Sequence, residues 1–253
     1  MSRLAVLSLH TSPLVQPGSG DSGGMNVYVR ELISAFARLG RESTVFVRRT
    51  DLTTPEVVDV EPGFRVVHVT AGALNLSKEE LPEVVDQFAD QVAKWIRKHG
   101  GFDGLLANYW LSGLAGHRLK HELDLPLTTV FHTLARVKAE TGDIEPQRRM
   151  DAETTVARCS DIILANSEEE AQQLVDLYGA DISRIEIVPP GVDHSLFSPG
   201  DQQEARNAIG LNGDPVLLFV GRIQPLKGVE LAIKTLADLK KYPNAQLIIV
   251  GGS

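Results

Sequence analysis

The chain has 253 residues, of which 43% are hydrophobic and 23% are charged, a composition typical of a globular protein with one or two domains. Its formal net charge of −8 excludes a bulk attraction to nucleic acid or to an anionic membrane surface. The single cysteine, Cys159, excludes an internal disulfide and favours a reducing, cytoplasmic setting, and no apolar run approaches the ~18 residues of a membrane span.

Strand and helix patterns alternate from the N-terminus to Pro190. The predicted strands cover 3–10, 43–49, 64–71, 104–110, 125–133, 161–167 and 184–191. The predicted helices cover 25–40, 78–100, 111–123, 146–160 and 167–179. Because the strands are nearly continuous apolar runs and the helices are amphipathic, the pattern predicts a doubly wound α/β domain whose parallel sheet is covered on both faces.

The pattern changes after Pro190. We interpret 191–213 as an interdomain connection with one short helix, because it is rich in Gly, Asp, Asn and Pro. A strand, a helix and a strand follow at 215–223, 229–243 and 245–253, so a second domain is predicted over 214–253. A single β-α-β unit cannot bury both faces of a sheet. We therefore expect either a fragment of a domain or a tail that packs on the first domain or on another chain.

The segment Gly18 to Gly23 matches the dinucleotide pattern G-x-G-x-x-G. That pattern needs its first glycine at the end of the first strand, yet here the strand ends near His10, and Arg48 and Arg49 stand where an acidic residue is expected. An NADP site stays open as a minor alternative. A second hypothesis is an anion site at the helix start after Gly23, and a third is a plain surface loop.

Several segments together identify a family. "LSLHTSPLVQPGSGDSGGMNVYVRELISAFARLG", "LSKEELP", "NYWLSG", "FHTLARVK", "ANSEEE", "VPPGVD", "FSPG" and "FVGRIQPLKG" occur in the order seen in family 4 retaining glycosyltransferases. The chain most resembles the D-inositol-3-phosphate glycosyltransferases of mycothiol synthesis and the sucrose-phosphate-synthase-like enzymes. The resemblance implies a GT-B fold, in which an N-terminal domain, here 1–190, binds the acceptor and an incomplete second Rossmann-like domain binds a nucleotide-sugar.

The resemblance implies a donor site built from two segments. Arg222 and Lys227 would hold the donor diphosphate, since two cations beside a helix N-terminus suit that group. Gly24 would add its backbone amide, and Gln16 and Pro17 resemble residues beside the donor. The plain alternative is that the two cations are solvated loop charges.

The acceptor site implied by the resemblance has a phosphate part and a polyol part. Lys78, Tyr109, Thr133 and Arg149 would bind the phosphate through charge and neutral hydrogen bonds, although Lys78 also fits a plain surface lysine and Tyr109 a packed aromatic residue. The residues implied for the polyol part are His10, Asp21, Ser22, Gly23, Gly24, Met25 and Asn26. Asp21 also fits a capping residue, and His10 a satisfied structural histidine.

His132 is the catalytic candidate, because the corresponding histidine of the family lies near the reacting centre. The seven histidines show neither an H-E-x-x-H motif nor a Cys/His ligand spacing, so neither a metal site nor a cofactor is predicted, and no serine lies in a hydrolase elbow. The family also carries a pair of glutamates beyond the matched region. From their absence we expect the 253-residue chain to be inactive or weak alone.

The leading hypothesis is a hexosyl or N-acetylglucosaminyl transferase that moves glucose or N-acetylglucosamine from a UDP-sugar to a phosphorylated polyol such as inositol phosphate. The alternatives are transfer to fructose 6-phosphate, a phospho-sugar-binding module without transfer, and an NADP oxidoreductase. The implied partners are the UDP-sugar, the phosphorylated acceptor and a second copy of the chain in a homodimer.

Overall fold

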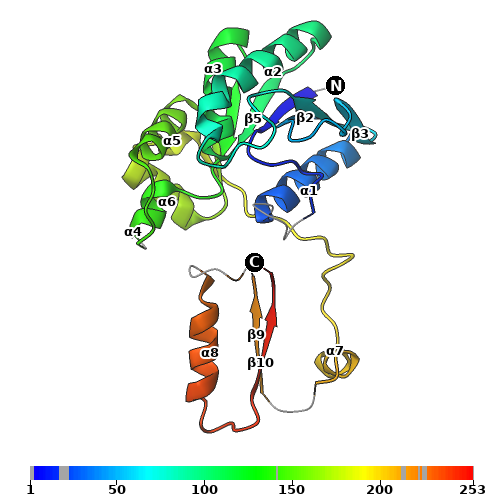
Figure 1. Cartoon of the computed structure of the whole chain (residues 1–253), viewed down its shortest axis with the longest axis vertical. Coiled ribbons are helices and arrows are strands. Elements are labelled where there is room, and N and C mark those ends of the chain that lie inside the picture. Colours follow the sequence, from blue (N-terminus) through cyan, green and yellow to red (C-terminus); the bar gives the residue numbers. More distant parts are fainter. Residues whose placement is uncertain are drawn as a thin grey trace. The chain divides into compact units, whose positions relative to one another are not determined.

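The computed structural model describes residues 3–16, 23–140, 142–211, 215–221, 223 and 227–252. These residues form two compact units (Figure 1). The first contains 3–15 and Gly24–Pro190, and the second contains the described residues after Pro190 together with Gln16 and Gly23. The first unit therefore ends at the residue where the composition changes.

The first unit is built on an eight-stranded sheet with the order β3-β4-β2-β1-β5-β6-β7-β8. Its strands are β1 (Arg3–Ser8), β2 (Glu42–Arg48), β3 (Val57–Glu61), β4 (Phe64–Val69), β5 (Gly104–Asn108), β6 (Leu127–Val130), β7 (Ile162–Ala165) and β8 (Ile185–Ile187). All neighbouring pairs are parallel except β3 with β4. The prediction of a doubly wound parallel sheet is confirmed, with one antiparallel strand added at its edge.

Helices cover both faces of this sheet. They are α1 (Gly24–Arg38), η1 (Leu81–Val84), α2 (Val85–His99), α3 (Tyr109–Leu123), α4 (Ala135–Glu140), α5 (Gln147–Cys159), α6 (Glu168–Tyr178) and η2 (Ile182–Arg184). Alternate residues of β1 point to opposite faces: Leu7 packs in a cluster with α2 and α3, whereas Val6 packs in a cluster with α1. Apolar cores thus lie on both faces of the sheet.

Three local predictions differ from the structure. Tyr109 and Trp110 were predicted to extend a strand, but the strand ends at Asn108 and Tyr109, at φ 75°, turns the chain into α3. The helix predicted from Lys78 begins with the 3₁₀ turn η1 at Leu81, which has proline in its first turn. Neither β3 nor α4 was predicted, because β3 is a short, half-exposed edge strand and α4 has only six residues.

The second unit contains α7 (Gln202–Ala208), β9 (Val216–Val220), α8 (Val229–Asp238) and β10 (Gln246–Val250). Strands β9 and β10 pair in parallel, with Leu218 opposite Ile248, as the β-α-β pattern predicts. The short helix predicted in the connection is α7, which is capped by the Asp201 side chain. No described residue of this unit is buried. None of the described helices in either unit combines the length and apolar character needed to cross a bilayer.

Candidate active site

The candidate site lies at the carboxyl ends of β1, β5 and β6. From β1 the chain continues to β2 on one side of the sheet and returns to β5 on the other, so the strand order reverses between β1 and β5. Open α/β sheets bind ligands in the crevice outside such a reversal. His10 follows β1 and Tyr109 follows β5, and their ring centroids are 5.3 Å apart. The predicted residues His10 and Tyr109 therefore meet at this point of the sheet.

Two residues with a strained backbone follow the neighbouring strands β5 and β6 at this edge of the sheet. Tyr109, directly after β5, has φ 75°, and His132, two residues after β6, has φ 62°. A non-glycine residue in this left-handed region costs on the order of 1–3 kcal/mol and persists only where the surrounding structure holds it. Such strain clusters at functional sites, so it independently marks the ends of β5 and β6.

His132 is a neutral, hydrogen-bonded residue. Its Nε2 lies 3.0 Å from Oδ1 of the fully buried Asn108, and because an amide oxygen only accepts, Nε2 donates in this arrangement. The ring of Tyr28 packs edge-on against it, with centroids 5.0 Å apart. Burial lowers the pKa of His132 to about 4. The imidazole is therefore uncharged at physiological pH.

Arg149 is buried at the start of α5 and is fixed by two glutamates. Its Nε donates to Glu153 Oε1 and its Nη1 to Glu145 Oε2, both at 2.8 Å. Its Nη2 donates to the carbonyl and the hydroxyl oxygens of Thr133, at 3.2 and 3.0 Å. Burial by itself lowers the pKa of Arg149, but Tyr109 and the two glutamates outweigh burial and the net pKa is raised. Arg149 thus stays charged and holds Thr133 in place.

Glu153 anchors this network in the core. Its carboxylate is fully buried and accepts three kinds of hydrogen bond: from Arg149, from the Ala135 backbone at 2.8 Å, and from the Tyr178 hydroxyl at 2.6 Å. Burial, then the bond to Glu153, raises the pKa of Tyr178. Every member of the network has a partner, which is the condition for a buried ion pair to be tolerated.

A pocket of about 310 Å³ opens beside Arg149. It is lined by Lys78, Glu79, Pro82, Tyr109, Trp110, Leu111, Lys138, Ile144, Glu145, Pro146, Arg148 and Arg149. The Arg149 guanidinium carbon lies 5.1 Å from the centroid of the Tyr109 ring. The lining has four basic and two acidic side chains and therefore a surplus of positive charge. The structure thus brings all four predicted phosphate ligands together, three as lining residues and Thr133 through Arg149.

The cations of this pocket differ in what they already bind. Lys78 is exposed and forms no ion pair or hydrogen bond through its ammonium with another described residue. Lys138 pairs with Glu145 and, at 3.2 Å, with Asp143. Arg148, the residue before Arg149 in the sequence, is half-exposed and pairs with Glu83 at 3.2 Å. Lys78 is therefore the pocket cation best able to accept a new anion.

The other predicted residues are placed as follows. Asn26 is buried and uses its amide nitrogen to donate to Thr11 Oγ1 and Ser12 O, at 2.7 and 2.6 Å, so it holds the segment after β1 against α1. Gly24 is exposed at the first position of α1, and Gly23 and Met25 flank it. Lys227 and Gln16 are exposed, and Lys227 precedes the Gly228 cap of α8. Pro17, Asp21, Ser22 and Arg222 lie outside the described residues.

Sequence reasoning missed four residues of this site: Asn108, Lys138, Glu145 and Glu153. The two glutamates stand four residues before and four after Arg149: Glu153 shares a face of α5 with Arg149, and Glu145 lies just before the helix begins. That spacing could have identified Arg149, rather than Arg148, as the inward arginine. Asn108 had no such signal, because its role depends on the neighbouring strand β6.

Comparisons with known proteins agree with this architecture. The profile described as Glycosyltransferase Family 4 matches residues 22–196, and the one described as Glycosyl transferases group 1 matches residues 201–253. A protein of Xylanimonas cellulosilytica named D-inositol 3-phosphate glycosyltransferase is 45% identical over 265 residues, covering 99% of this chain and 63% of that protein. One from Catenulispora acidiphila, named D-inositol 3-phosphate glycosyltransferase 2, is 46% identical, covering 99% and 62%.

Solved structures show the same fold. Sucrose-phosphate synthase from Thermosynechococcus elongatus matches with a TM-score of 0.89 and 29% identity, over 100% of this chain and 63% of that one. Anabaena HepE, solved in complex with UDP-glucose, matches with a TM-score of 0.69 and 17% identity, over 100% and 61%, which speaks for the fold alone. The chain thus spans about 63% of the curated relative in X. cellulosilytica. It belongs to glycosyltransferase family 4 and has the α/β architecture of the GT-B glycosyltransferases.

Proposed function

We propose that this chain provides the acceptor site of a retaining glycosyltransferase that moves a sugar, glucose or N-acetylglucosamine, from a UDP-sugar to a phosphorylated polyol such as inositol phosphate. The observation that carries the proposal is the positively charged pocket at the strand reversal, where Lys78, Tyr109 and Arg149 meet. The names of the relatives in X. cellulosilytica and C. acidiphila support an inositol phosphate as the acceptor.

The acceptor phosphate enters between Lys78 and Thr133. The Lys78 ammonium supplies the charge, and the hydroxyls of Tyr109 and Thr133 supply neutral hydrogen bonds. The Glu145 carboxylate already bridges the two cations Lys138 and Arg149, as an anion in the same pocket would. A phosphate therefore competes with Glu145 for positive charge, and the affinity is set partly by that competition.

In the transfer step, a hydroxyl oxygen of the acceptor bonds to the anomeric carbon and the bond from that carbon to the diphosphate breaks. The diphosphate keeps the electron pair and takes the hydroxyl proton. Because the acceptor attacks the same face of the sugar from which the diphosphate leaves, the anomeric configuration is retained. Neutral His132 positions the donor without adding charge, and the Gly24 amide at the start of α1 donates to the diphosphate. The family resemblance assigns Lys227 and Arg222 to neutralising the negative charge that develops on the diphosphate, and the proposed step needs no metal.

A second acceptor has a specific observation in its favour. The sucrose-phosphate synthase of Thermosynechococcus elongatus is 29% identical to this chain over its whole length. Fructose 6-phosphate and inositol phosphate both present a phosphate beside ring hydroxyls. The chemistry of the pocket fits both acceptors, so a comparison of their measured affinities is needed to decide between them.

The test is calorimetric titration of the 253-residue chain with inositol 3-phosphate, fructose 6-phosphate and unphosphorylated inositol. Acceptor binding is the decisive measurement, because the proposal places the acceptor site in this chain, whereas transfer is a property of relatives that are longer than this chain. We expect the phosphorylated polyol to bind, unphosphorylated inositol to bind at least about tenfold more weakly, and Glu145→Gln to tighten phosphate binding. Equal affinity for inositol with and without the phosphate would remove the proposed acceptor class. Mass-spectrometric detection of a glycoside after UDP-sugar addition separates transfer from binding alone.

A further inference from the structure

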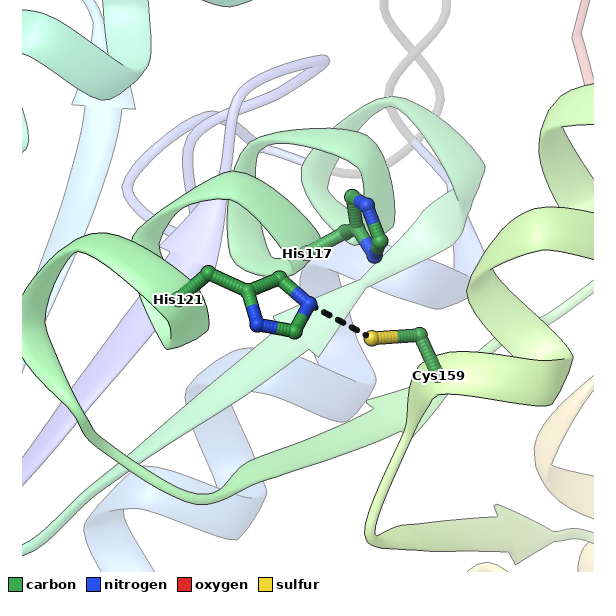
Figure 2. Close-up of side chains that lie close together, drawn as sticks. All are labelled: His117, His121 and Cys159. Atoms are coloured by element: carbon green, nitrogen blue, oxygen red, sulfur yellow. Dashed lines mark hydrogen bonds between the residues drawn. The ribbon is translucent and has the colours of Figure 1, made fainter.

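Three side chains of metal-ligating type converge where α3 and α5 approach their C-terminal ends (Figure 2). His117 and His121 are four residues apart on α3, so they project from one face of the helix. Cys159 is the last residue of α5, and its Sγ lies 3.4 Å from His121 Nε2. One ligand atom from each of the three residues lies within 4.8 Å of the others.

These separations suit a tetrahedral ion. With metal–sulfur and metal–nitrogen bonds of normal length, neighbouring ligand atoms around zinc are about 3.4–3.6 Å apart. The His121–Cys159 distance already has this value, and the separations to His117 are at most 4.8 Å, so small side-chain rotations bring the three ligand atoms to this spacing. His117 Nδ1 is buried and has no hydrogen-bond partner among the described residues. A cation would supply the partner that this imidazole lacks.

The surrounding chain holds the two helices together at this point. Lys120, between the two histidines, donates to the Cys159 carbonyl at 2.8 Å and pairs with Asp161 at 2.6 Å, so its positive charge is compensated. Nearer the N-termini of the two helices, a Cβ added to Gly113 would lie only 2.8 Å from Val156 Cγ1, which shows how closely α3 approaches α5. The cluster is thus preformed by helix packing.

We propose that His117, His121 and Cys159 form a binding site for a thiophilic divalent cation, best Zn²⁺, with the fourth position left for water. Imidazole and thiolate are the ligands that zinc prefers, and binding displaces the thiol proton to solvent. The site is separate from the proposed transfer centre: Tyr109 and Arg149 start the same helices, about 12–18 Å away along the helix axes. The bound ion joins the ends of the two helices that carry those pocket residues.

The test is titration of the tag-free 253-residue chain with Zn²⁺ alone, under a reductant that does not chelate metal. We expect saturable one-to-one binding and a rise in the unfolding temperature. His121→Ala, at an exposed position, and Cys159→Ser should each weaken binding by at least about 100-fold, more than the loss of an outer-shell partner causes. The control His194→Ala removes an exposed histidine of the second unit and should bind like the unmodified chain.

Co²⁺ gives a second readout that does not depend on stability. Its thiolate charge-transfer band should appear in the unmodified chain and in His194→Ala and disappear in Cys159→Ser. No saturable Zn²⁺ binding, or equal affinity in His121→Ala and the unmodified chain, overturns the proposal. A Cys159→Ser variant that binds Zn²⁺ as tightly as the unmodified chain also overturns it, because the site would then be only a pair of surface histidines.

Discussion

In the first unit Phe46, Phe88 and Leu127 are completely shielded from solvent, whereas in the second unit Leu218, Val220 and Leu231 are 64%, 69% and 68% exposed. Both units use parallel strands with a crossover helix. They differ in how many layers cover those strands: the first sheet has helices on both faces, whereas the described part of the second unit has two strands with α8 packed against them and the short helix α7. The local sequence pattern therefore produces the same kinds of element in both units. A buried core forms only in the unit whose sheet is covered by helices on both faces.

This difference bears on the two halves of the proposed site. The proposed acceptor residues and the catalytic candidate His132 lie in the first unit, where Glu153 is hydrogen-bonded to Arg149 and Asn108 to His132. The proposed donor residue Lys227 stands on an exposed segment of the second unit. We expect the acceptor half to be preorganised and to respond strongly to mutation, and the second unit to respond weakly.

The largest contrast is expected from truncating one apolar side chain in each unit. Phe88→Ala leaves a cavity in the fully buried cluster between the sheet and α2 and should lower the free energy of unfolding by about 3–5 kcal/mol. Leu218→Ala changes an exposed side chain and should cost less than about 1 kcal/mol. Urea unfolding followed by circular dichroism measures both. A loss at Leu218 as large as that at Phe88 would show that β9 is buried in solution.

A somewhat smaller contrast is expected between two glutamates. Glu153→Gln leaves the buried Arg149 guanidinium short of a carboxylate and should cost about 3 kcal/mol of unfolding free energy. Glu230→Gln, at the exposed first turn of α8, should cost only a few tenths of a kcal/mol, from the helix dipole. Chemical denaturation compares them under identical conditions. Equal small losses would mean that the Arg149 network contributes no specific stability.

The pH dependence of stability isolates His132. Its folded pKa of about 4 lies below the ordinary value of 6.5, so the unfolded chain takes up the proton first as the pH falls. The contribution of neutral His132 to stability is fully present above the unfolded-state pKa and is lost as the pH falls towards the folded-state pKa. The free energy of unfolding should fall by about 2 kcal/mol between about pH 7 and about pH 5. His132→Asn removes this titration, and asparagine tolerates the left-handed backbone. Unfolding curves give the difference in free energy of unfolding between the two proteins, which should be smaller at about pH 5 than at about pH 7. The same difference at both pH values would contradict the assignment.

The alternation of strands and helices, and the parallel sheet, were predictable because apolar runs and amphipathic periods report burial directly. Tyr109 was placed in a strand because aromatic residues favour strands, and only the tertiary structure shows that its backbone turns at φ 75°. Lys78, Tyr109, Thr133 and Arg149 were found through family motifs, and the structure adds that they meet. The sequence does not predict the His117–His121–Cys159 cluster, because Cys159 lies 38 positions after His121 and only the packing of α3 on α5 joins them.

The smallest effect, and the one that separates the two units most directly, is expected from two exposed lysines. Lys78→Ala removes the unpaired cation of the acceptor pocket and should weaken inositol 3-phosphate binding about tenfold, or about 1.4 kcal/mol, with little change for unphosphorylated inositol. Lys227→Ala removes a similar charge from the second unit and should leave acceptor binding unchanged. Titration calorimetry at low and high salt checks both, since added salt should reduce the Lys78 effect. If both variants bind the phosphate tenfold more weakly, acceptor recognition requires the second unit as well, and the preorganised first unit is not sufficient for it.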